Sequence, residues 1–271
     1  MRKSAAIIVN PVSGHGRSLR KAQKVQRLLD QSGLDVELLL TEAAQHGRTL
    51  ANEIASSVEV LVCVGGDGTV NEVANGLVDA GQDTPILIIP TGTANVIFRE
   101  IGLPGDLESQ VKLAMDSSVR LLDLGRAGDR FFIMCAGAGF DAAIVDTISQ
   151  TRTQSGISML SYIMPTLRET FRYPFPRMRV TINGKDFDEG ATFVVIANMQ
   201  RYGGVRDFAR YAWGAFRQNL MDYNDIAFYR GKQIKLEADE RVLVQVDGDR
   251  GGELPMLFTL MPGAVSFCVE K

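Results

Sequence analysis

The fold class is indicated by one stretch of sequence, Val58-Glu-Val-Leu-Val-Cys-Val-Gly-Gly-Asp-Gly-Thr69. Residues 58–64 are almost all apolar, which is typical of a strand buried on both faces of a parallel sheet. The glycine-rich turn at 65–69 leads into a segment with helical spacing that ends near Gly76 to Gly81. This stretch therefore predicts a strand, a tight loop and a helix in immediate succession.

The same arrangement repeats on both sides of this stretch. Further strands are predicted at 5–9, 36–40 and 85–89, and helices at 18–30, 47–56 and after Asn95. Strand and helix thus alternate at least four times in the first 120 residues. This alternation predicts an α/β fold whose N-terminal part is a doubly wound parallel sheet with helices on both faces.

Beyond residue 120 the pattern changes to shorter segments of β character. Strands are predicted at 131–135, 177–182, 192–197, 233–237, 242–246 and 262–269, and helices at 158–171 and 207–220. Asn183-Gly184 and Asp247-Gly248 are typical hairpin turns. We therefore expect an α/β domain over 1–120 and a C-terminal β-rich, β-sandwich-like domain over 121–271, whose last strand could return to the first domain.

The composition excludes several classes of protein. The chain has 271 residues, 45% of them hydrophobic, and a formal net charge of −3 from 29 basic and 32 acidic side chains. This balance argues against generic nucleic-acid binding. The three cysteines lie in apolar runs and indicate buried thiols in a reducing compartment. Because no apolar run is long enough for a membrane span or a secretory signal, we expect a cytoplasmic protein whose contact with membranes is peripheral.

Three small-residue loops each follow a predicted buried strand and precede a helix. They lie at 10–17, 65–69 and 90–95, so a parallel sheet would place all three at one carboxyl edge. Glycine amides and helix N-termini attract anions such as phosphate, while Asp67 implies a bridging Mg²⁺ or a substrate hydroxyl. The alternative is a tight turn whose aspartate caps the helix. The P-loop and Rossmann dinucleotide patterns are absent from all three loops.

Four motifs in this order resemble the diacylglycerol kinase catalytic-domain family, which includes bacterial lipid kinases and is related to sphingosine kinases. They are Asn10-Pro-Val-Ser-Gly14, Gly65-Gly-Asp-Gly-Thr-Val-Asn-Glu72, Pro90-Thr-Gly-Thr-Ala-Asn95 and Val246-Asp-Gly-Asp249. The resemblance implies that ATP and Mg²⁺ bind between a nucleotide-binding α/β domain and a β-rich lipid-substrate domain. It also implies that the acceptor is a lipid hydroxyl at the membrane surface.

The resemblance assigns roles to individual residues. Asp67 and Asp123 match acidic positions of the metal network, and Asp67 is also expected to be catalytic. Asp249 lies where the family usually has a glutamate that deprotonates the acceptor, and the nearby Glu253 is a second candidate for this base. The positions that match nucleotide and phosphate contacts or the wall around them are Asn10, Ser13, Gly14, Thr41, Gly65, Gly66, Gly68, Thr69, Thr93 and Asn95.

The chain departs from the family pattern in two further places. Val96 replaces an aspartate found in many relatives, and some two dozen residues are missing between Gly204 and Val205. The leading hypothesis is a kinase for a diacylglycerol-like, phosphatidylglycerol-like or sphingoid lipid. A kinase for NAD or a small metabolite, and a catalytically impaired nucleotide- or lipid-binding regulator, are the alternatives. The sequence does not decide whether the chain forms a homodimer.

Overall fold

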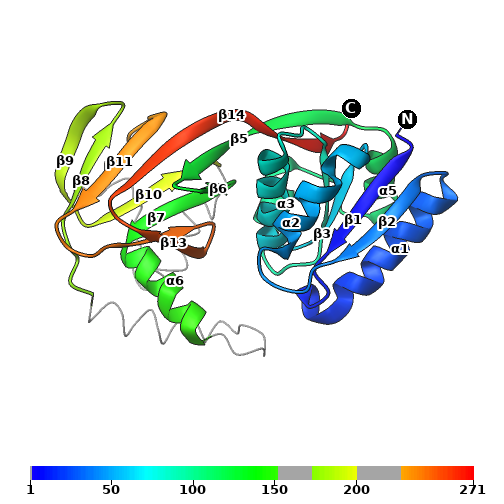
Figure 1. The fold of residues 1–271 in the computed structure, drawn as a ribbon, viewed down its shortest axis with the longest axis horizontal. Helices are drawn as coiled ribbons and strands as arrows, with labels where there is room; N and C mark the ends of the chain where they lie inside the picture. The colour runs from blue at the N-terminus through cyan, green and yellow to red at the C-terminus, as the bar shows by residue number, and fades with distance from the viewer. Residues whose placement is uncertain (1, 152–172, 200–226) are drawn as a thin grey trace. The chain divides into compact units, whose positions relative to one another are not determined.

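A computed structural model describes residues 2–151, 173–199 and 227–271 of the chain (Figure 1). The chain divides into two compact units: unit 1 comprises Met1–Leu124 and Pro262–Lys271, and unit 2 comprises Gly125–Met261. The helices predicted at 158–171 and 207–220, and the shortening between Gly204 and Val205, lie outside the described residues. No helix in the described ranges is long and apolar enough to cross a membrane.

Unit 1 contains the predicted parallel sheet. Its strands run in the order β2-β1-β3-β4, and the end of β14 pairs in parallel with β4 through Phe267 and Ile86. The central strands are buried along almost their whole length, as their continuous apolar sequences predict. The strands are β1 (Ser4–Val9), β2 (Asp35–Leu40), β3 (Leu61–Gly65), β4 (Ile86–Pro90) and β14 (Met256–Val269).

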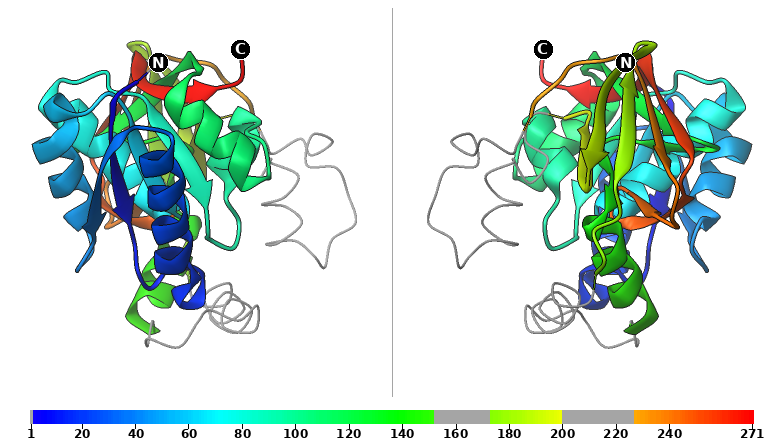
Figure 2. Two further views of the ribbon diagram at one scale, coloured as in Figure 1. Left: turned by 90° about the vertical axis from the view of Figure 1, so that its right-hand side faces the viewer. Right: turned by 90° about the vertical axis from the view of Figure 1, so that its left-hand side faces the viewer.

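Helices cover both faces of this sheet. In Figures 1 and 2 the pair α2 and α3 lies on one face, and α1 and α5 lie on the other. The buried side of α1 presents Ala22, Val25 and Leu29, which are spaced by three and four residues. The helices are α1 (Arg17–Gln31), α2 (His46–Ile54), α3 (Asp67–Ala80), α4 (Val96–Ile101) and α5 (Leu107–Met115), with 3₁₀ turns η1 (Ser13–Gly16) and η2 (Ala55–Ser57). The prediction of a doubly wound α/β fold is confirmed.

Unit 2 is built from antiparallel strands. One four-stranded sheet has the order β10-β7-β12-β13, and β8, β9, β11 and the start of β14 belong to the larger sheet. The elements are β5 (Ser118–Ala127), β6 (Arg130–Phe132), β7 (Cys135–Gly139), α6 (Phe140–Thr151), β8 (Met178–Ile182), β9 (Lys185–Ala191), β10 (Phe193–Ala197), β11 (Gln233–Ala238), β12 (Leu243–Val246) and β13 (Asp249–Glu253). β5 and β14 each contribute residues to both units.

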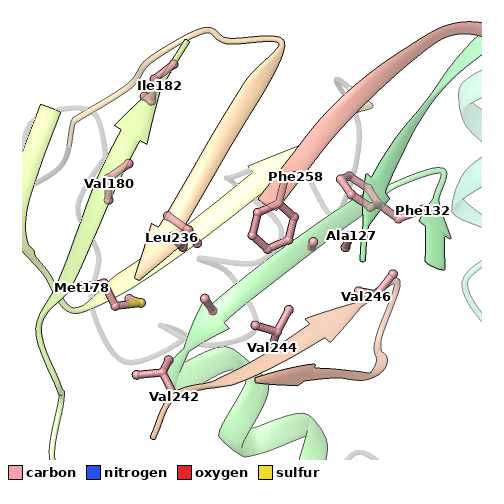
Figure 3. Close-up of a cluster of buried hydrophobic side chains, with 12 residues drawn as sticks. Ala127, Phe132, Met178, Val180, Ile182, Leu236, Val242, Val244, Val246 and Phe258 are labelled. Carbon is pink, nitrogen blue, oxygen red and sulfur yellow. The ribbon is translucent and has the colours of Figure 1, made fainter. Parts of the chain in front are cut away.

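A hydrophobic core fills the space between the two sheets of unit 2 (Figure 3). Val244 and Val246 enter this core from β12, and Leu236 and Phe258 enter it from the larger sheet. Since neighbouring side chains of a strand point to opposite faces, Gln245 points away from the core. The opposite face of the four-stranded sheet is the one on which α6 packs.

Candidate functional site

The three glycine-bearing loops of unit 1 meet at the carboxyl edge of the sheet. Ser13 Oγ and Thr91 Oγ1 are 3.1 Å apart and form a hydrogen bond between the first loop and the third. Thr91 N donates to Gly65 O at 2.9 Å, which joins the second loop to the third. The backbones of Gly66 and Gly92 approach so closely that a Cβ added at Gly92 would lie 2.7 Å from Gly66 Cα. Loops that are distant in sequence therefore form one contiguous surface.

The N-terminus of α3 lies at this meeting point. Gly66 is the N-cap in an extended conformation, and no side chain of the described residues caps the helix. The first backbone amides of an uncapped helix are free to bind an anion, and the helix dipole favours negative charge there. Gly68 is exposed, with nothing within 4 Å of the place where its Cβ would be. Thr69 is buried against Gly65 and closes the turn behind these amides.

Asp67 does not cap its own helix, which was the alternative considered from sequence. Its Oδ1 instead accepts a hydrogen bond of 3.0 Å from Ile97 N, in the first turn of α4. Its Oδ2 has no hydrogen-bond partner among the residues that the structure describes. The carboxylate is partly exposed, so one oxygen is fixed and the other remains available to a ligand.

The other predicted contacts of unit 1 surround this point or support it. Asn10 Oδ1 accepts from Val12 N at 3.1 Å, which shapes the loop that leads into η1 and Gly14. Asn95 closes the third loop on itself through two hydrogen bonds with the backbone of Gly92. Thr93 is exposed on that loop. Thr41 is buried at the end of β2, and its N donates to Val9 O at 2.9 Å.

Two cationic side chains at these loops were not predicted from the sequence. Lys21 Nζ donates to Pro90 O at 3.1 Å, and Arg17 Nε donates to Gly14 O at 3.0 Å. Burial lowers the pKa of Lys21 below its usual range. Both residues are in α1, one helical turn apart, which places them on the same side of that helix. This spacing after a glycine-bearing loop is the signal that could have identified them.

Glu72, in the second turn of α3, supports the site from behind. Its two carboxylate oxygens accept from Gln45 N at 2.9 Å and Gly47 N at 3.0 Å, at the start of α2. The neighbouring Cys63 is buried, and burial together with the charges of Glu72 and Asp67 raises the pKa of its thiol well above the ordinary value. Cys63 is therefore a neutral packing residue, in agreement with the prediction of buried thiols.

In unit 2 the Asp247-Gly248 pair forms the predicted hairpin turn between β12 and β13. Both residues have positive φ, 49° and 84°, as a two-residue type I′ turn requires. The Asp247 carboxylate accepts three backbone hydrogen bonds, from Ile133, Met134 and Cys135, at 2.8 to 2.9 Å. Asp247 therefore anchors the turn to the chain that enters β7.

Asp249 and Glu253 stand at the two ends of β13 and differ in their partners. Asp249 is 53% exposed, and its nearest cation is Arg130 at 3.7 Å. Glu253 Oε1 accepts two hydrogen bonds from the Arg241 guanidinium, the longer at 2.9 Å. This bond holds the pKa of Glu253 below its usual range, which weakens it as an acceptor of protons.

A buried polar cluster lies behind the Asp247-Gly248 turn. Gln245 Nε2 donates to Asp141 Oδ2 at 2.8 Å, and Gln245 Oε1 accepts from Gly248 N at 2.8 Å. Burial raises the pKa of Asp141 to about 6, against the lowering effect of the Gln245 bond. Neither Asp141 nor Gln245 was identified from the sequence, because no helix was predicted at 140–151 and nothing within the predicted strand at 242–246 indicates a partner for Gln245.

Asp123, the second predicted metal ligand, lies on β5, where its Oδ1 accepts from Gly263 N at 2.8 Å. Among the described residues there is no cluster of three or more His, Cys, Asp or Glu side chains that could hold a metal ion. A role of Asp123 in metal binding remains a prediction.

The chain is similar in sequence to several known proteins. Residues 4–127 match the sequence model of the diacylglycerol kinase catalytic domain. The chain is 26% identical over 286 residues to a diacylglycerol kinase of Bacillus subtilis, covering 93% of this chain and 92% of that protein. It is 31% identical over 205 residues to a diacylglycerol kinase of Mycobacterium tuberculosis, covering 73% of this chain and 65% of that protein.

The fold agrees with a solved structure as well. A crystal structure of a diacylglycerol kinase from Bacillus anthracis superposes with a TM-score of 0.74 at 24% identity, covering 99% of this chain and 98% of that one. Residues 4–127 thus carry the catalytic-domain sequence of diacylglycerol kinases, and the chain is similar to diacylglycerol kinases along most of its length.

Proposed function

We propose that the protein is a lipid kinase that transfers the γ-phosphoryl group of ATP to the hydroxyl of a diacylglycerol-like lipid. The observation that carries this proposal is the meeting of three glycine-bearing loops at the uncapped N-terminus of α3, beside an aspartate with one unbonded oxygen. Such an arrangement suits the phosphates of a nucleotide. The names of the relatives favour diacylglycerol over phosphatidylglycerol-like or sphingoid acceptors.

In this proposal unit 1 binds the nucleotide. The amides of residues 67–69 and the cations of Lys21 and Arg17 balance the charge of the phosphates. A single carboxylate together with nucleotide phosphates is the usual way in which Mg²⁺ is held, so the open oxygen of Asp67 fits that ion. When bound, Mg²⁺ would neutralise part of the phosphate charge. Asp123 is a further candidate ligand.

Asp249 takes the proton of the acceptor hydroxyl. The acceptor oxygen forms a bond to the γ-phosphorus, the bond from that phosphorus to the bridging oxygen breaks, and ADP leaves. We assign the base to Asp249 because it is half exposed and holds its cation at 3.7 Å, whereas Glu253 is engaged by Arg241. Proton transfer to a positioned base typically contributes about 10²- to 10⁴-fold in rate.

The test is phosphate transfer from labelled ATP to diacylglycerol in mixed micelles with Mg²⁺. We expect Asp67→Asn and Asp249→Asn to lower kcat by at least about 100-fold. Glu253→Gln and Asp129→Asn, which changes an exposed turn residue, serve as matched controls and should stay within about threefold of the wild type. Full activity of Asp67→Asn would refute the assignment of the site.

The same assay separates the alternative functions. Phosphorylation of NAD or another soluble acceptor without micelles would indicate a small-metabolite kinase. Binding of ATP in calorimetry without turnover on any lipid would indicate a regulator, to which the replacement by Val96 would then contribute.

A further inference from the structure

The backbone amide of Gly248 needs a partner that the hairpin itself does not supply. In a two-residue hairpin the ladder hydrogen bonds join the two residues that flank the turn, here Val246 and Asp249. The amide of the second turn residue, here Gly248, forms no ladder hydrogen bond. Gln245 Oε1 accepts from this amide at 2.8 Å. The side chain of Gln245, two residues before the turn, thus completes the hydrogen bonding of the turn.

Gln245 is in turn fixed from the other side. Its side chain is buried, with 1% exposure, and it lies on the face of β12 that α6 covers. Nε2 donates to Asp141 Oδ2 at 2.8 Å and to Cys135 Sγ at 3.4 Å. These bonds determine which way the amide group is turned, and therefore place its oxygen toward Gly248.

The local sequence makes room for this contact. Gly137 pairs with Gln245 across the antiparallel ladder of β7 and β12. A Cβ at Gly137 would lie 2.4 Å from Asp141 Oδ2 and 2.9 Å from Gln245 Nε2. The chain then turns sharply at Gly139, where φ is 99°, so that the first turn of α6 folds Asp141 back over Gly137. A larger residue at 137 would separate the two side chains.

We propose that Asp141 and Gln245 are positioning residues, which orient the Asp247-Gly248 turn and with it the carboxylate of Asp249 for proton transfer. The chain of contacts runs from Asp141 through Gln245 to Gly248 N, one residue before Asp249. The inference rests on the proposed function, because the orientation of the turn affects catalysis only if Asp249 is the base. Replacing Gln245 by an apolar residue of similar shape removes both hydrogen-bonding contacts of its buried side-chain amide.

Gln245→Met, Asp141→Leu and Asp249→Asn test this inference, with Val180→Ala as a matched control. Val180 is a buried residue of the hydrophobic core of unit 2 and does not belong to the polar cluster of Asp141 and Gln245. The amide exchange rate of Gly248 is measured by NMR, and kcat and KM are measured in the micelle assay. We expect Gln245→Met and Asp141→Leu to accelerate exchange at Gly248 and to lower kcat about tenfold with KM for ATP unchanged. Asp141→Asn, which keeps an acceptor for Gln245, should recover most of this loss.

The double variant Gln245→Met with Asp249→Asn separates positioning from general damage. If Gln245 acts through Asp249, its replacement should lower kcat less than twofold once that carboxylate is absent, because the two effects are then not additive. A further tenfold loss, or a kcat loss equal to that of Val180→Ala, would overturn the inference. If Asp249→Asn alone retained the wild-type kcat, the base assigned under the proposed function would be wrong, and the role of the cluster in catalysis would fall with it.

Discussion

The glycine loops of unit 1 and the hairpin turn of unit 2 are held in place by different means. In unit 1 the backbones of Gly66 and Gly92 touch, and side chains such as Ser13 add single bonds. In unit 2 the turn is held by side chains: the Asp247 carboxylate accepts hydrogen bonds from three backbone amides, and the Gln245 side chain accepts one. The difference indicates that substitutions should act through steric overlap in the first region and through lost hydrogen bonds in the second.

The largest effect on stability is expected at Asp247. Asp247→Ala leaves three part-buried amides without their acceptor, and each unsatisfied group costs about 1–3 kcal/mol. We expect unit 2 to lose about 3–5 kcal/mol of unfolding free energy, measured by hydrogen exchange of β7 peptides in a urea series.

Asp249→Ala is the matched control, since that carboxylate is two residues away and half exposed. It should change the stability of unit 2 by less than about 0.5 kcal/mol. Equal losses for the two variants would mean that the hairpin as a whole, and not the Asp247 carboxylate, stabilises this region.

A smaller effect that depends on pH is expected at Asp141. Its pKa is raised from 3.8 to about 6 by burial, so the folded state holds this proton more tightly than the unfolded state does. The resulting stabilisation is complete below pH 3.8 and is lost as the pH rises through about 6. The shift corresponds to at most about 3 kcal/mol.

Asp141→Asn removes this titration. Relative to the wild type, the variant should therefore gain up to about 3 kcal/mol in unfolding free energy between pH 3.5 and pH 7. Urea unfolding followed by hydrogen exchange of β7 and β12 peptides measures this difference at each pH. Val180→Ala, which removes no titratable group, should show no such trend. A constant difference between Asp141→Asn and wild type at all pH values would contradict the prediction.

The sequence predicted unit 1 far better than unit 2, for physical reasons. Buried parallel strands are continuous apolar runs, and each is followed by a helix of clear periodicity. Several elements of unit 2 lack such a signal. Cys135–Gly139 is a strand made of alanine and glycine after a cysteine, and Asp249–Glu253 has two glycines and three charged residues. Cys135–Gly139 is a strand because it pairs with β10 and β12, which are distant in sequence, and Asp249–Glu253 is a strand because it pairs with β12 across the hairpin turn.

The residues of the candidate site also differ in how well the sequence predicted them. The motif residues of the three loops were all named from the sequence, since glycine-rich strand-to-helix turns are recognisable one at a time. The supporting residues were not, because they act through contacts across the fold. Lys21 bonds to a carbonyl 69 positions away, and Gln245 bonds to a carboxylate 104 positions away. The only local signal for Lys21 is its spacing from Arg17 after the glycine-bearing loop, and Gln245 has none.

The smallest effect on stability is expected from two alanine substitutions in unit 1. They test whether substitutions in the glycine loops act through steric overlap. In Gly92→Ala the new Cβ would lie 2.7 Å from Gly66 Cα and 2.9 Å from Asn95 Oδ1, so the two loops must move apart. Overpacking of this kind costs about 1–3 kcal/mol. In Gly68→Ala the Cβ enters open space in the first turn of α3, where alanine is about 0.4–1 kcal/mol more favourable than glycine. Thermal unfolding without nucleotide should therefore move in opposite directions for the two variants. If both variants raised the unfolding temperature, the close approach of Gly66 and Gly92 would not hold the loops together, and the hydrogen bonds of Ser13 and Asn95 would have to carry that role.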